Sequence, residues 1–516
     1  MRFRTRRKAI WSGAAALGLA LAGGGPVGPA DAASAPISCA SLAGLSLPDV
    51  RITSAAPIEA QAAFRPEPGA QPAPVKSPFC RVQGVIETEI RFELWLPAGA
   101  AWNGRFLGAG VGGDAGTFNF ADLPRGVARG YAAATTDTGH RADDETWMLG
   151  DPARLKNFEL RANHLLAEKS KLIVAAYYAR PAAKAYFIGC SGGGRQGLKE
   201  AQRFPADYDG IIAGAPGPDT PEMTVRRMWE IILRDDNKGL MSAADWALLA
   251  DAGAKSCDAA DGVVDGVAED PRKCRFDPAD LQCREGQTGG CLTPKQVALA
   301  RTIYGPLHDE TGRKLDDGLL PGVLVDSGRS RLAPRTFGQA IRRQSNWNGE
   351  GFKPGADLVA LKRAMPDLQA DDPDLSAFEA RGGKLILYHG WIDPAVAARM
   401  VSGYYDKVEK AAGGAKAARG FTRLFMAPGM LHCGGGPGPD RFGGAGADAP
   451  VVDANHDLLS ALETWVEQGR APDRIVASKL AAGGGVARTR PLCAYPMSAH
   501  YRGAGSTDAA ENFVCK

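Results

Sequence analysis

The chain has 516 residues, with 61 Lys and Arg against 58 Asp and Glu, and therefore a formal charge of +3. Hydrophobic residues make up 45% and charged residues 23%, which is a globular composition and excludes an intrinsically disordered chain. The weak net charge and the lack of long like-charge runs exclude a nucleic-acid-binding arm. We therefore expect no nucleic-acid partner.

The first 32 residues have the order of a secretory signal peptide. Five basic residues within positions 1–8 precede an uncharged stretch of 14 residues, 9–22, and small residues surround position 31. This stretch is shorter than the about 20 residues that a transmembrane helix needs, which disfavours the alternative of an uncleaved membrane anchor. We predict a secreted or periplasmic protein. Cleavage after Ala32 leaves 56 basic and 57 acidic side chains, a charge of −1, and no membrane association.

Ten cysteines follow the predicted cleavage site, and an even number in an exported chain indicates up to five disulfides. A zinc site is the competing interpretation, but the chain lacks C-x2-C and H-x3–5-H spacings. Spacing leaves the connectivity open, and the simplest local pairs are Cys257/Cys274, Cys283/Cys291 and Cys493/Cys515. The other cysteines are Cys39, Cys80, Cys190 and Cys433.

Short apolar strands alternate with helical spacings in two parts of the chain, which is typical of a parallel sheet covered by helices. Residues 33–80 are rich in Ala and Pro and are expected to form loops. Strands are then expected at 88–96, 106–111, 131–136, 185–189 and 208–215, and helices at 160–178 and 195–204.

The alternation stops after Pro216 and resumes near residue 381. Strands are expected at 384–389 and 422–426, and helices at 395–410 and 454–468. The sequence between is charged, interrupted by Gly and Pro, and irregular. We predict one α/β domain, residues 33–216 and 381–516, that is interrupted by an insertion, residues 217–380.

The sequence Gly189-Cys190-Ser191-Gly192-Gly193 fits the G-x-S-x-G motif between an apolar strand and a helical segment. This context is that of a nucleophile elbow, in which small neighbours allow a tight strand-to-helix turn that exposes the serine hydroxyl. The alternative is a glycine-rich turn with a capping serine. We predict that Ser191 is a nucleophile.

A serine hydroxyl is a weak nucleophile without a base. In chains with this motif the serine comes first, then the acid, and then the histidine that acts as the base. His432 lies on a loop after the strand 422–426 and is the candidate base. Asp393 follows the strand 384–389, at the sheet edge where α/β sites assemble, and is the candidate acid. Helix capping is the alternative role of Asp393. His389 is expected to be structural.

Cys190 precedes Ser191, and Cys433 follows His432. If serine and histidine meet in a catalytic triad, their neighbouring cysteines lie close together. We therefore expect a Cys190–Cys433 disulfide that joins the base loop to the nucleophile elbow.

Residues 108–113 read Gly-Ala-Gly-Val-Gly-Gly and fit the dinucleotide-binding pattern G-x-G-x-x-G. The residues after Gly113 do not open a clear helix, which disfavours a nicotinamide-dependent oxidoreductase. In a serine hydrolase, a backbone N–H near Gly113 would join that of Gly192 in an oxyanion hole. Gly112 is the alternative donor.

Residues 257–267 form an acidic loop with regular glycines. They lack the Glu that an EF-hand loop has at its twelfth position. Three carboxylates and the backbone carbonyls of the turns nevertheless suit a hard cation. The alternative is a solvated run of Asp-Gly turns.

The chain resembles the tannase and feruloyl esterase family, which includes mono(2-hydroxyethyl) terephthalate hydrolases. The resemblance runs from about residue 39 to Lys516 and is carried by Cys190-Ser191, Asp393 and His432-Cys433, by Thr-Asp-Thr-Gly-His at 136–140, and by Arg-Pro-Leu-Cys-Ala-Tyr-Pro at 490–496. It implies an α/β-hydrolase fold with a large lid, here the insertion. It also implies a structural Ca²⁺ ion, with ligands at Asp258, Asp261, Val263, Asp265 and Val267.

The resemblance implies a carboxylic ester hydrolase that acts on small esters of hydroxycinnamic, gallic or related benzoic acids. Trp347 and Phe337 are candidate lid aromatics, with core packing as the alternative. Val396 is small for a position where a terephthalate-ester hydrolase carries an aromatic wall, which disfavours that substrate. The alternative of a different class is a secreted binding protein that retains an idle triad.

Overall fold

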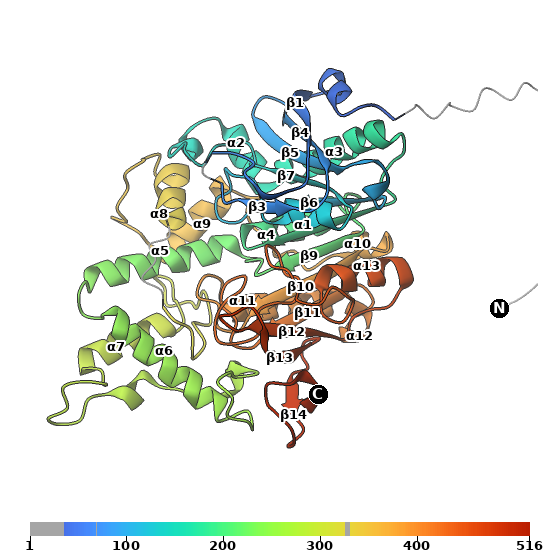
Figure 1. Ribbon diagram of the computed structural model, residues 1–516. Coiled ribbons are helices and arrows are strands. Elements are labelled where there is room, and N and C mark those ends of the chain that lie inside the picture. The colour runs from blue at the N-terminus through green and yellow to red at the C-terminus, as the bar shows by residue number, and fades with distance from the viewer. Residues whose placement is uncertain (1–35, 69, 326–330) are drawn as a thin grey trace, which may run out of the picture.

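A computed structural model describes residues 36–68, 70–325 and 331–516, and the predicted signal peptide lies outside these residues. A nine-stranded sheet forms the centre, in the order β1-β4-β5-β7-β6-β8-β9-β10-β11 (Figure 1). Its strands are β1 (Val50–Ile58), β4 (Phe79–Ile86), β5 (Ile90–Pro97), β6 (Arg105–Ala109), β7 (Ala132–Thr136), β8 (Lys184–Cys190), β9 (Gly210–Gly214), β10 (Lys384–Gly390) and β11 (Thr422–Ala427).

The sheet is mixed, so the expectation of a parallel sheet holds for only one part of it. The strands from β7 through β6 to β11 run parallel, whereas β1, β4, β5 and β7 pair antiparallel. The connection between β4 and β5 is too short for the crossover that parallel neighbours need. The expectation of loops over residues 33–80 was also wrong, because it missed the edge strand β1.

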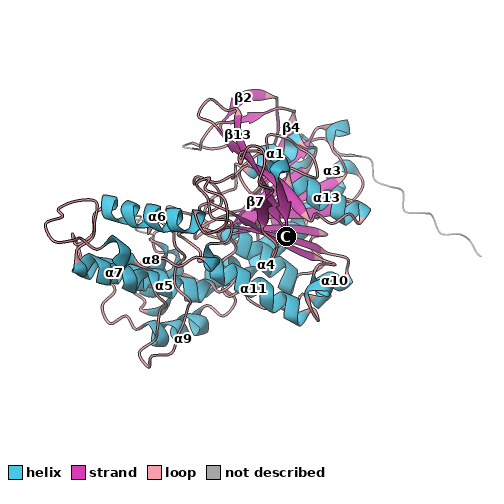
Figure 2. Ribbon diagram, turned by 90° about the horizontal axis from the view of Figure 1, so that it is seen from below, coloured by secondary structure: helices cyan, strands magenta, loops and turns pink. Residues whose placement is uncertain are grey.

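Helices cover both faces of the sheet (Figure 2). One face packs against α3 (Ala162–Tyr178), α4 (Gly192–Arg203) and α11 (Ala398–Ala411), and the other against α1 (Asp122–Ala128) and α13 (Leu458–Gln468). Phe187 and Ile188, neighbours in β8, enter opposite core clusters because successive strand residues point to opposite faces. The shorter helices are α2 (Pro152–Lys156), α10 (Ser376–Ala380) and α12 (Ala415–Ala418).

The predicted insertion is helical, which corrects the expectation of irregular structure. It contains α5 (Thr220–Asp236), α6 (Ala243–Asp258), α7 (Pro294–Tyr304), α8 (Leu332–Arg335) and α9 (Pro354–Ala364), gathered on one side of the sheet (Figure 2). Asp219, Ser242 and Thr293 cap α5, α6 and α7 by accepting backbone N–H bonds. The polar residues and prolines that interrupt the pattern therefore mark helix starts.

All ten cysteines form disulfides, and the three local pairs predicted from spacing are confirmed. The remaining bonds are Cys39–Cys80 and Cys190–Cys433. Small antiparallel pairs flank the main sheet: β2 (Gln61–Phe64) with β3 (Ala73–Val75), β12 (Arg474–Leu480) with β13 (Val486–Cys493), and β14 (Ala499–Tyr501) with β15 (Phe513–Cys515). In the described parts of the chain, no helix has the length and apolar character that crossing a membrane requires.

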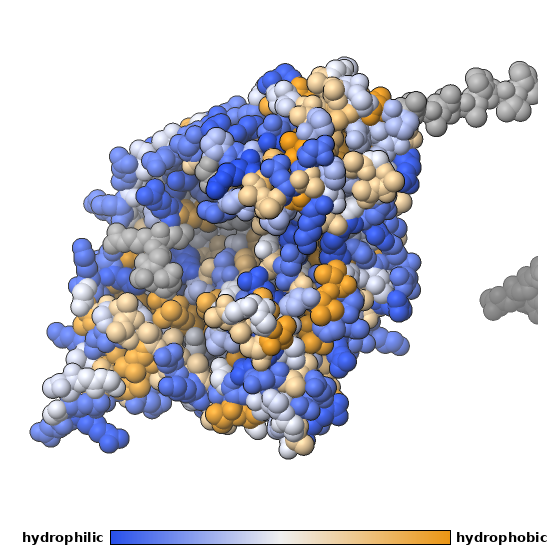
Figure 3. All heavy atoms as spheres, viewed as in Figure 1, coloured by the Kyte–Doolittle hydropathy of each residue, from blue (hydrophilic) through white to orange (hydrophobic). Residues whose placement is uncertain are grey.

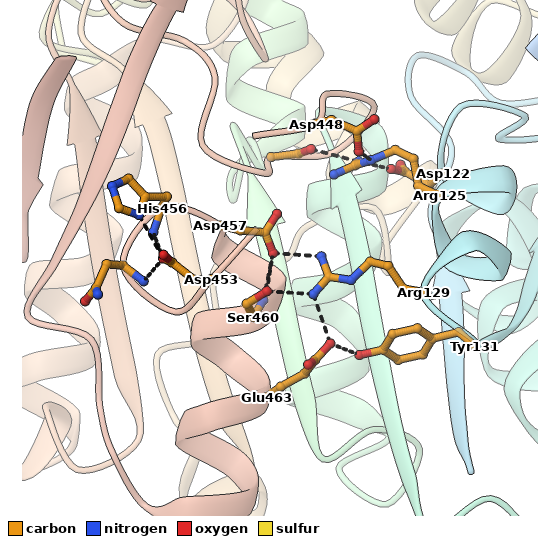
Figure 4. A network of polar contacts seen from close by, with 12 residues as sticks. Asp122, Arg125, Arg129, Tyr131, Asp448, Asp453, His456, Asp457, Ser460 and Glu463 are labelled. Carbon is orange, nitrogen blue, oxygen red and sulfur yellow. Dashed lines mark hydrogen bonds and ion pairs between the residues drawn. The ribbon is translucent and has the colours of Figure 1, made fainter. Parts of the chain in front are cut away.

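A network of ion pairs holds α1 against α13 and the segment before it (Figure 4). Arg129 pairs with Asp457 at 2.7 Å and with Glu463 at 3.1 Å, and Arg125 pairs with Asp448 at 2.7 Å. Helix α1 follows the glycine loop, while the partner segment follows the loop that carries the candidate base. The network therefore joins the segment that follows the glycine loop to the segment that follows the His432 loop, on one face of the sheet.

Candidate active site

Ser191 lies at the turn between β8 and α4 with φ 60° and ψ −123°, a conformation that L-residues rarely adopt. A Cβ at Gly192 would lie 2.8 Å from the carbonyl oxygen of Gly113, and one at Gly193 would lie 2.9 Å from the carbonyl carbon of Gly110. Only glycine allows the elbow and the glycine loop to approach this closely. The strained turn and its small neighbours are those of a nucleophile elbow.

The His432 ring lies on the loop after β11, and Asp393 lies on the loop after β10. Nδ1 of His432 and Oδ2 of Asp393 are 2.8 Å apart. The other carboxylate oxygen of Asp393 accepts the N–H groups of Ala395, at 2.7 Å, and Val396, at 3.0 Å. Asp393 therefore holds its own loop and the His432 ring at once.

The Cys190–Cys433 disulfide joins the elbow to the His432 loop, with a Cα–Cα distance of 6.0 Å. The structure therefore brings the three predicted triad residues to one edge of the sheet. Within the described chain the Ser191 hydroxyl makes no direct hydrogen bond with the His432 ring. Such contacts are often long in enzymes without substrate.

Asp393 is buried, with 1% of its surface exposed. Burial opposes its ionisation, but the hydrogen bond with His432 and the nearby His389 hold the pKa of Asp393 below its ordinary value. His389 is fully buried, which lowers the pKa of its ring, and Nε2 lies 3.0 Å from the carbonyl oxygen of Val396. Asp393 is therefore an ionised carboxylate beside a neutral structural histidine.

Gly113, Ser191 and Gly192 line one cavity. The amides of Gly112 and Gly113 have no hydrogen-bond partner within the described chain. The Gly192 amide is at the N-terminus of α4, where backbone N–H groups lack helical acceptors. The cavity therefore has donors beside the serine, at the positive end of a helix dipole.

Gln196, buried in α4, holds the glycine loop in place. Its Oε1 accepts the Val111 N–H at 3.0 Å, and its Nε2 donates to the Val111 carbonyl at 3.2 Å. Two hydrogen bonds therefore join helix α4 to the loop with the candidate oxyanion donors. This role was missed from the sequence, where the only signal was a polar residue on a buried helix face.

The cavity beside Ser191 is mainly apolar and is lined in part by the insertion. Its larger apolar residues are Phe158, Met223, Leu332, Met365, Leu368 and Val396, and Ala215 and Pro216 also line it. Among the described residues that line it, none is acidic, and the three threonine hydroxyls donate to backbone carbonyls. Figure 3 shows the surface hollowed where the insertion meets the rest of the chain.

Arg195 also lines this cavity and was not among the residues predicted for the site. Its guanidinium donates to the carbonyls of Glu159, at 2.8 Å, and Phe158, at 3.0 Å, and lies 5.1 Å from the centre of the Phe158 ring. Burial lowers the pKa of Arg195 to about 10, so the side chain stays charged at neutral pH. The wall therefore contains a buried positive charge one helical turn from Ser191.

Two arginines of the insertion contact loops of the site. Arg335 in α8 forms an ion pair with Asp114, which follows Gly113. Arg227 in α5 donates to the carbonyl of Pro394, which follows Asp393. The insertion therefore contacts both the glycine loop and the acid loop.

The proposed lid aromatics do not line the cavity beside Ser191. Phe337 is fully buried, and its ring packs edge-on against Phe352 at 5.2 Å and lies 6.2 Å from Trp347. Both aromatics therefore pack in a core cluster that the insertion shares with Trp147 and Phe158, which is the alternative role expected for them.

His140, at the end of the motif 136–140, supports the cavity wall. Its ring stacks on Trp147 at 3.8 Å and lies edge-on to Phe158 at 6.1 Å. Burial lowers the pKa of His140 to about 4. His140 therefore has a packing role, because it supports Phe158, which lines the cavity.

The carboxylates of the acidic loop 257–267 accept backbone N–H groups of the same segment or just after it. Asp258 accepts the N–H groups of Asp265 and Gly266, both at 3.0 Å, and Asp261 accepts those of Val263, at 3.2 Å, and Glu269, at 2.9 Å. Burial raises the pKa of Asp261, and the charges of Asp265 and Asp258 raise it further.

Arg490 pairs with Asp265 and with Glu269 and offsets part of this charge. Within the described residues, no three His, Cys, Asp or Glu side chains are arranged to hold a metal ion. The oxygen donors and their mutual repulsion nevertheless fit the chemistry that Ca²⁺ prefers. Calcium stays a prediction.

The sequence matches the family described as tannase and feruloyl esterase over residues 75–322 and 339–516. It is 37% identical to an uncharacterised esterase of Xanthomonas campestris, over 94% of this chain and 92% of that protein. It is 34% identical to the mono(2-hydroxyethyl) terephthalate hydrolase of Piscinibacter sakaiensis, over 89% and 87%.

The fold is similar to the crystal structure of feruloyl esterase B from Aspergillus oryzae. The TM-score is 0.87 at 26% sequence identity, and the match covers 93% of this chain and all of that one. The structural similarity, the sequence identity and the family match all indicate the same family of esterases. The chain therefore belongs to the tannase and feruloyl esterase family and is a carboxylic ester hydrolase.

Proposed function

We propose that the protein is a secreted serine esterase that hydrolyses esters of hydroxycinnamic, gallic or related benzoic acids. The proposal is carried by one observation, the linkage of three loops. The Cys190–Cys433 disulfide joins the loops of Ser191 and His432, and the His432–Asp393 hydrogen bond adds the acid. This linkage supports a Ser-His-Asp triad.

The first half of the proposed reaction forms an acyl-enzyme. The hydroxyl of Ser191 attacks the ester carbonyl while Nε2 of His432 takes its proton, since Nδ1 faces Asp393. Asp393 orients the ring and stabilises the imidazolium. His432 then donates the proton to the alkoxide that leaves, and the acyl group stays on Ser191.

In the second half, water attacks the acyl-enzyme and gives its proton to His432. The tetrahedral intermediate collapses, Ser191 takes the proton back, and the acid leaves. Substrate binding is expected to close the Ser191–His432 contact, because catalytic hydrogen bonds tighten in the substrate complex.

Backbone N–H groups of Gly113 and Gly192 are the proposed oxyanion donors. Both residues line the cavity with Ser191, which favours Gly113 over Gly112. The α4 N-terminus and the Arg195 guanidinium add positive potential where negative charge develops. Gln196 supports the loop that presents the Gly113 amide.

The mainly apolar cavity supports an aromatic acyl group, because such sites bind rings through buried apolar surface and a few polar contacts. The insertion supplies Met223, Leu332 and Met365 to this cavity, so we propose that it acts as the lid and selects the acyl group. The names of the family and of the structural relative favour feruloyl or galloyl esters.

Hydrolysis of mono(2-hydroxyethyl) terephthalate is the alternative, and it is favoured by the relative from Piscinibacter sakaiensis. Val396 lines the cavity as a small side chain and offers no aromatic wall to a terephthaloyl ring. The same triad would hydrolyse both kinds of ester, so the residues that bind the acyl group decide which of the two substrates is preferred.

Export and calcium binding are further parts of the proposal. Five disulfides suit an oxidising compartment, and residues 1–32 supply the signal pattern. The carboxylates of Asp258, Asp261 and Asp265 and the carbonyls of Val263 and Val267 would hold a structural Ca²⁺ ion. A bound ion would neutralise the loop beside the Cys257–Cys274 disulfide.

A substrate panel tests the function. We expect the mature protein to hydrolyse methyl ferulate, methyl gallate or chlorogenate faster than mono(2-hydroxyethyl) terephthalate, and Ser191→Ala to remove the activity. Equal rates for the wild type and Ser191→Ala would disprove the triad. A preference for the terephthalate ester would select the alternative.

A further inference from the structure

Residues 267–272 of the insertion, here called the contact segment, lie against the loop that carries the proposed acid. The guanidinium carbon of Arg272 lies 4.7 Å from the centre of the Trp391 ring. Trp391 is buried and comes two residues before Asp393 on the loop after β10. A guanidinium over an indole ring is attracted by the negative face of that ring. This contact therefore holds the start of the acid loop against the insertion.

The contact segment also packs on the loop that carries the proposed base. Val267 is 3% exposed, and a Cβ built on Gly429 would lie 2.6 Å from its Cγ1. Gly429 comes three residues before His432. Because only glycine permits so close an approach, the base loop lies directly against the insertion at this point.

The acid loop and the base loop are in turn joined by their backbones. The N–H of Trp391 donates to the carbonyl of Ala427, at 3.0 Å. The N–H of Ile392 donates to the carbonyl of Met430, at 3.3 Å. A shift of Trp391 would therefore displace the loops of both the proposed acid and the proposed base.

Hydrogen bonds fix the position of the Arg272 guanidinium. Nε and Nη2 donate to the two carboxylate oxygens of Asp270, at 2.8 and 2.9 Å, and Nη1 donates to the hydroxyl of Tyr495, at 2.7 Å. The guanidinium carbon also lies 5.0 Å from the centre of the Tyr495 ring. A bidentate bond to a carboxylate sets both the place and the orientation of a guanidinium. Arg272 can therefore hold the Trp391 ring in one position.

We propose that Arg272 and Val267 are positioning residues, through which the insertion aligns the proposed acid and base as well as enclosing the substrate. This inference rests on the proposed function. The described residues that line the cavity beside Ser191 include neither of them. Their replacement should therefore lower kcat and leave KM unchanged, because it affects the chemical step and not the binding of substrate.

Hydrolysis of methyl ferulate by Arg272→Met tests the inference. The variant keeps an apolar side chain on the rings but loses the guanidinium. We expect kcat to fall about tenfold with KM unchanged, because misaligned catalytic groups react slowly.

Arg342→Met is the matched control and should keep the kcat of the wild type. Arg342 also belongs to the insertion, and its side chain is 26% exposed, against 27% for Arg272. It forms an ion pair with Asp357 at 2.7 Å and lies 5.2 Å from the centre of the Trp347 ring. These partners lie outside the acid and base loops.

Val267→Ala keeps the inference testable if Arg272→Met does not fold. It shortens the side chain on Gly429 and should lower kcat about threefold with KM unchanged. Val297→Ala in α7 is its control, because Val297 is also 3% exposed and lies in the insertion. The melting temperatures of each variant and its control should fall by similar amounts, which separates alignment from stability.

The inference is overturned if Arg272→Met and Val267→Ala keep the kcat of their controls, or if they raise KM at unchanged kcat, as a role in binding would. A failure of the proposed function gives a different result. Ser191→Ala would then hydrolyse methyl ferulate as fast as the wild type does, or the wild type would not hydrolyse it.

Discussion

The Cys190–Cys433 disulfide joins the residue before Ser191 to the residue after His432, two positions that are 243 residues apart in the sequence. Each cysteine lies next to a proposed catalytic residue, so the bond restricts the distance between Ser191 and His432. We therefore propose that the disulfide maintains the geometry of the proposed reaction as well as the stability of the fold.

Replacing both cysteines, Cys190→Ala with Cys433→Ala, should lower kcat/KM for methyl ferulate about tenfold or more, since misplaced catalytic groups react slowly. The free energy of unfolding should fall by about 2–5 kcal/mol while the fold remains. Kinetics and urea unfolding measure both effects. Cys283→Ala with Cys291→Ala is the control, because that bond spans eight residues in the insertion and should leave kcat/KM unchanged. Unchanged kcat/KM in the first variant would contradict this role.

Gln196→Leu should reduce kcat about 10- to 100-fold with little change in KM, because oxyanion stabilisation acts mainly in the transition state. The variant loses both hydrogen bonds to Val111 and releases the loop that carries Gly113. Gln202→Leu, in the same helix but bonded to the carbonyl of Ala370, is the matched control. Equal kcat values in the two variants would show that Gln196 does not position the loop.

The stability of the protein should depend on pH through His140. Its folded pKa, about 4, lies below the ordinary value of 6.5, so the unfolded chain binds the proton more readily. The contribution of His140 is complete above pH 6.5 and is lost as the pH falls toward 4, by at most roughly 3 kcal/mol. His140→Phe keeps the stacking on Trp147 and should flatten the pH profile in urea unfolding. Parallel profiles for variant and wild type would rule this out.

Calcium should stabilise the protein through the acidic loop. Adding CaCl₂ to chelator-treated protein should raise the melting temperature by several degrees, since a ligand that binds only the folded state stabilises it. Asp261→Asn should abolish the response. Asp309→Asn changes an exposed turn elsewhere in the insertion and should retain it. A wild-type melting temperature that does not respond to calcium would contradict the predicted site.

The strands that carry the site could be predicted because both of their faces are buried. The strands predicted at 185–189, 384–389 and 422–426 are observed as Lys184–Cys190, Lys384–Gly390 and Thr422–Ala427. Continuous apolar runs and the motif around Ser191 marked them. The edge strand β1 was missed because alternate residues are exposed and its sequence lacks an apolar run.

The support around the site could not be predicted, because it depends on contacts between distant positions. Arg335 and Asp114 are 221 residues apart, and Gln196 and Val111 are 85 apart. No local pattern marks such pairs. The helices of the insertion did carry a local signal, because Ser242 and Thr293 are capping residues. A capping residue marks a helix start only when the residues after it are recognised as a helix, and here they were not.

The central claim is that Ser191 is the nucleophile of an esterase, and covalent labelling tests it most directly. A fluorophosphonate transfers its phosphonyl group to an activated serine and releases fluoride. Peptide mass spectrometry should place the adduct on Ser191, with loss of methyl ferulate hydrolysis in proportion to labelling, and His432→Ala should not be labelled. Full activity after labelling, or an adduct on another residue that accompanies inactivation, would contradict the account.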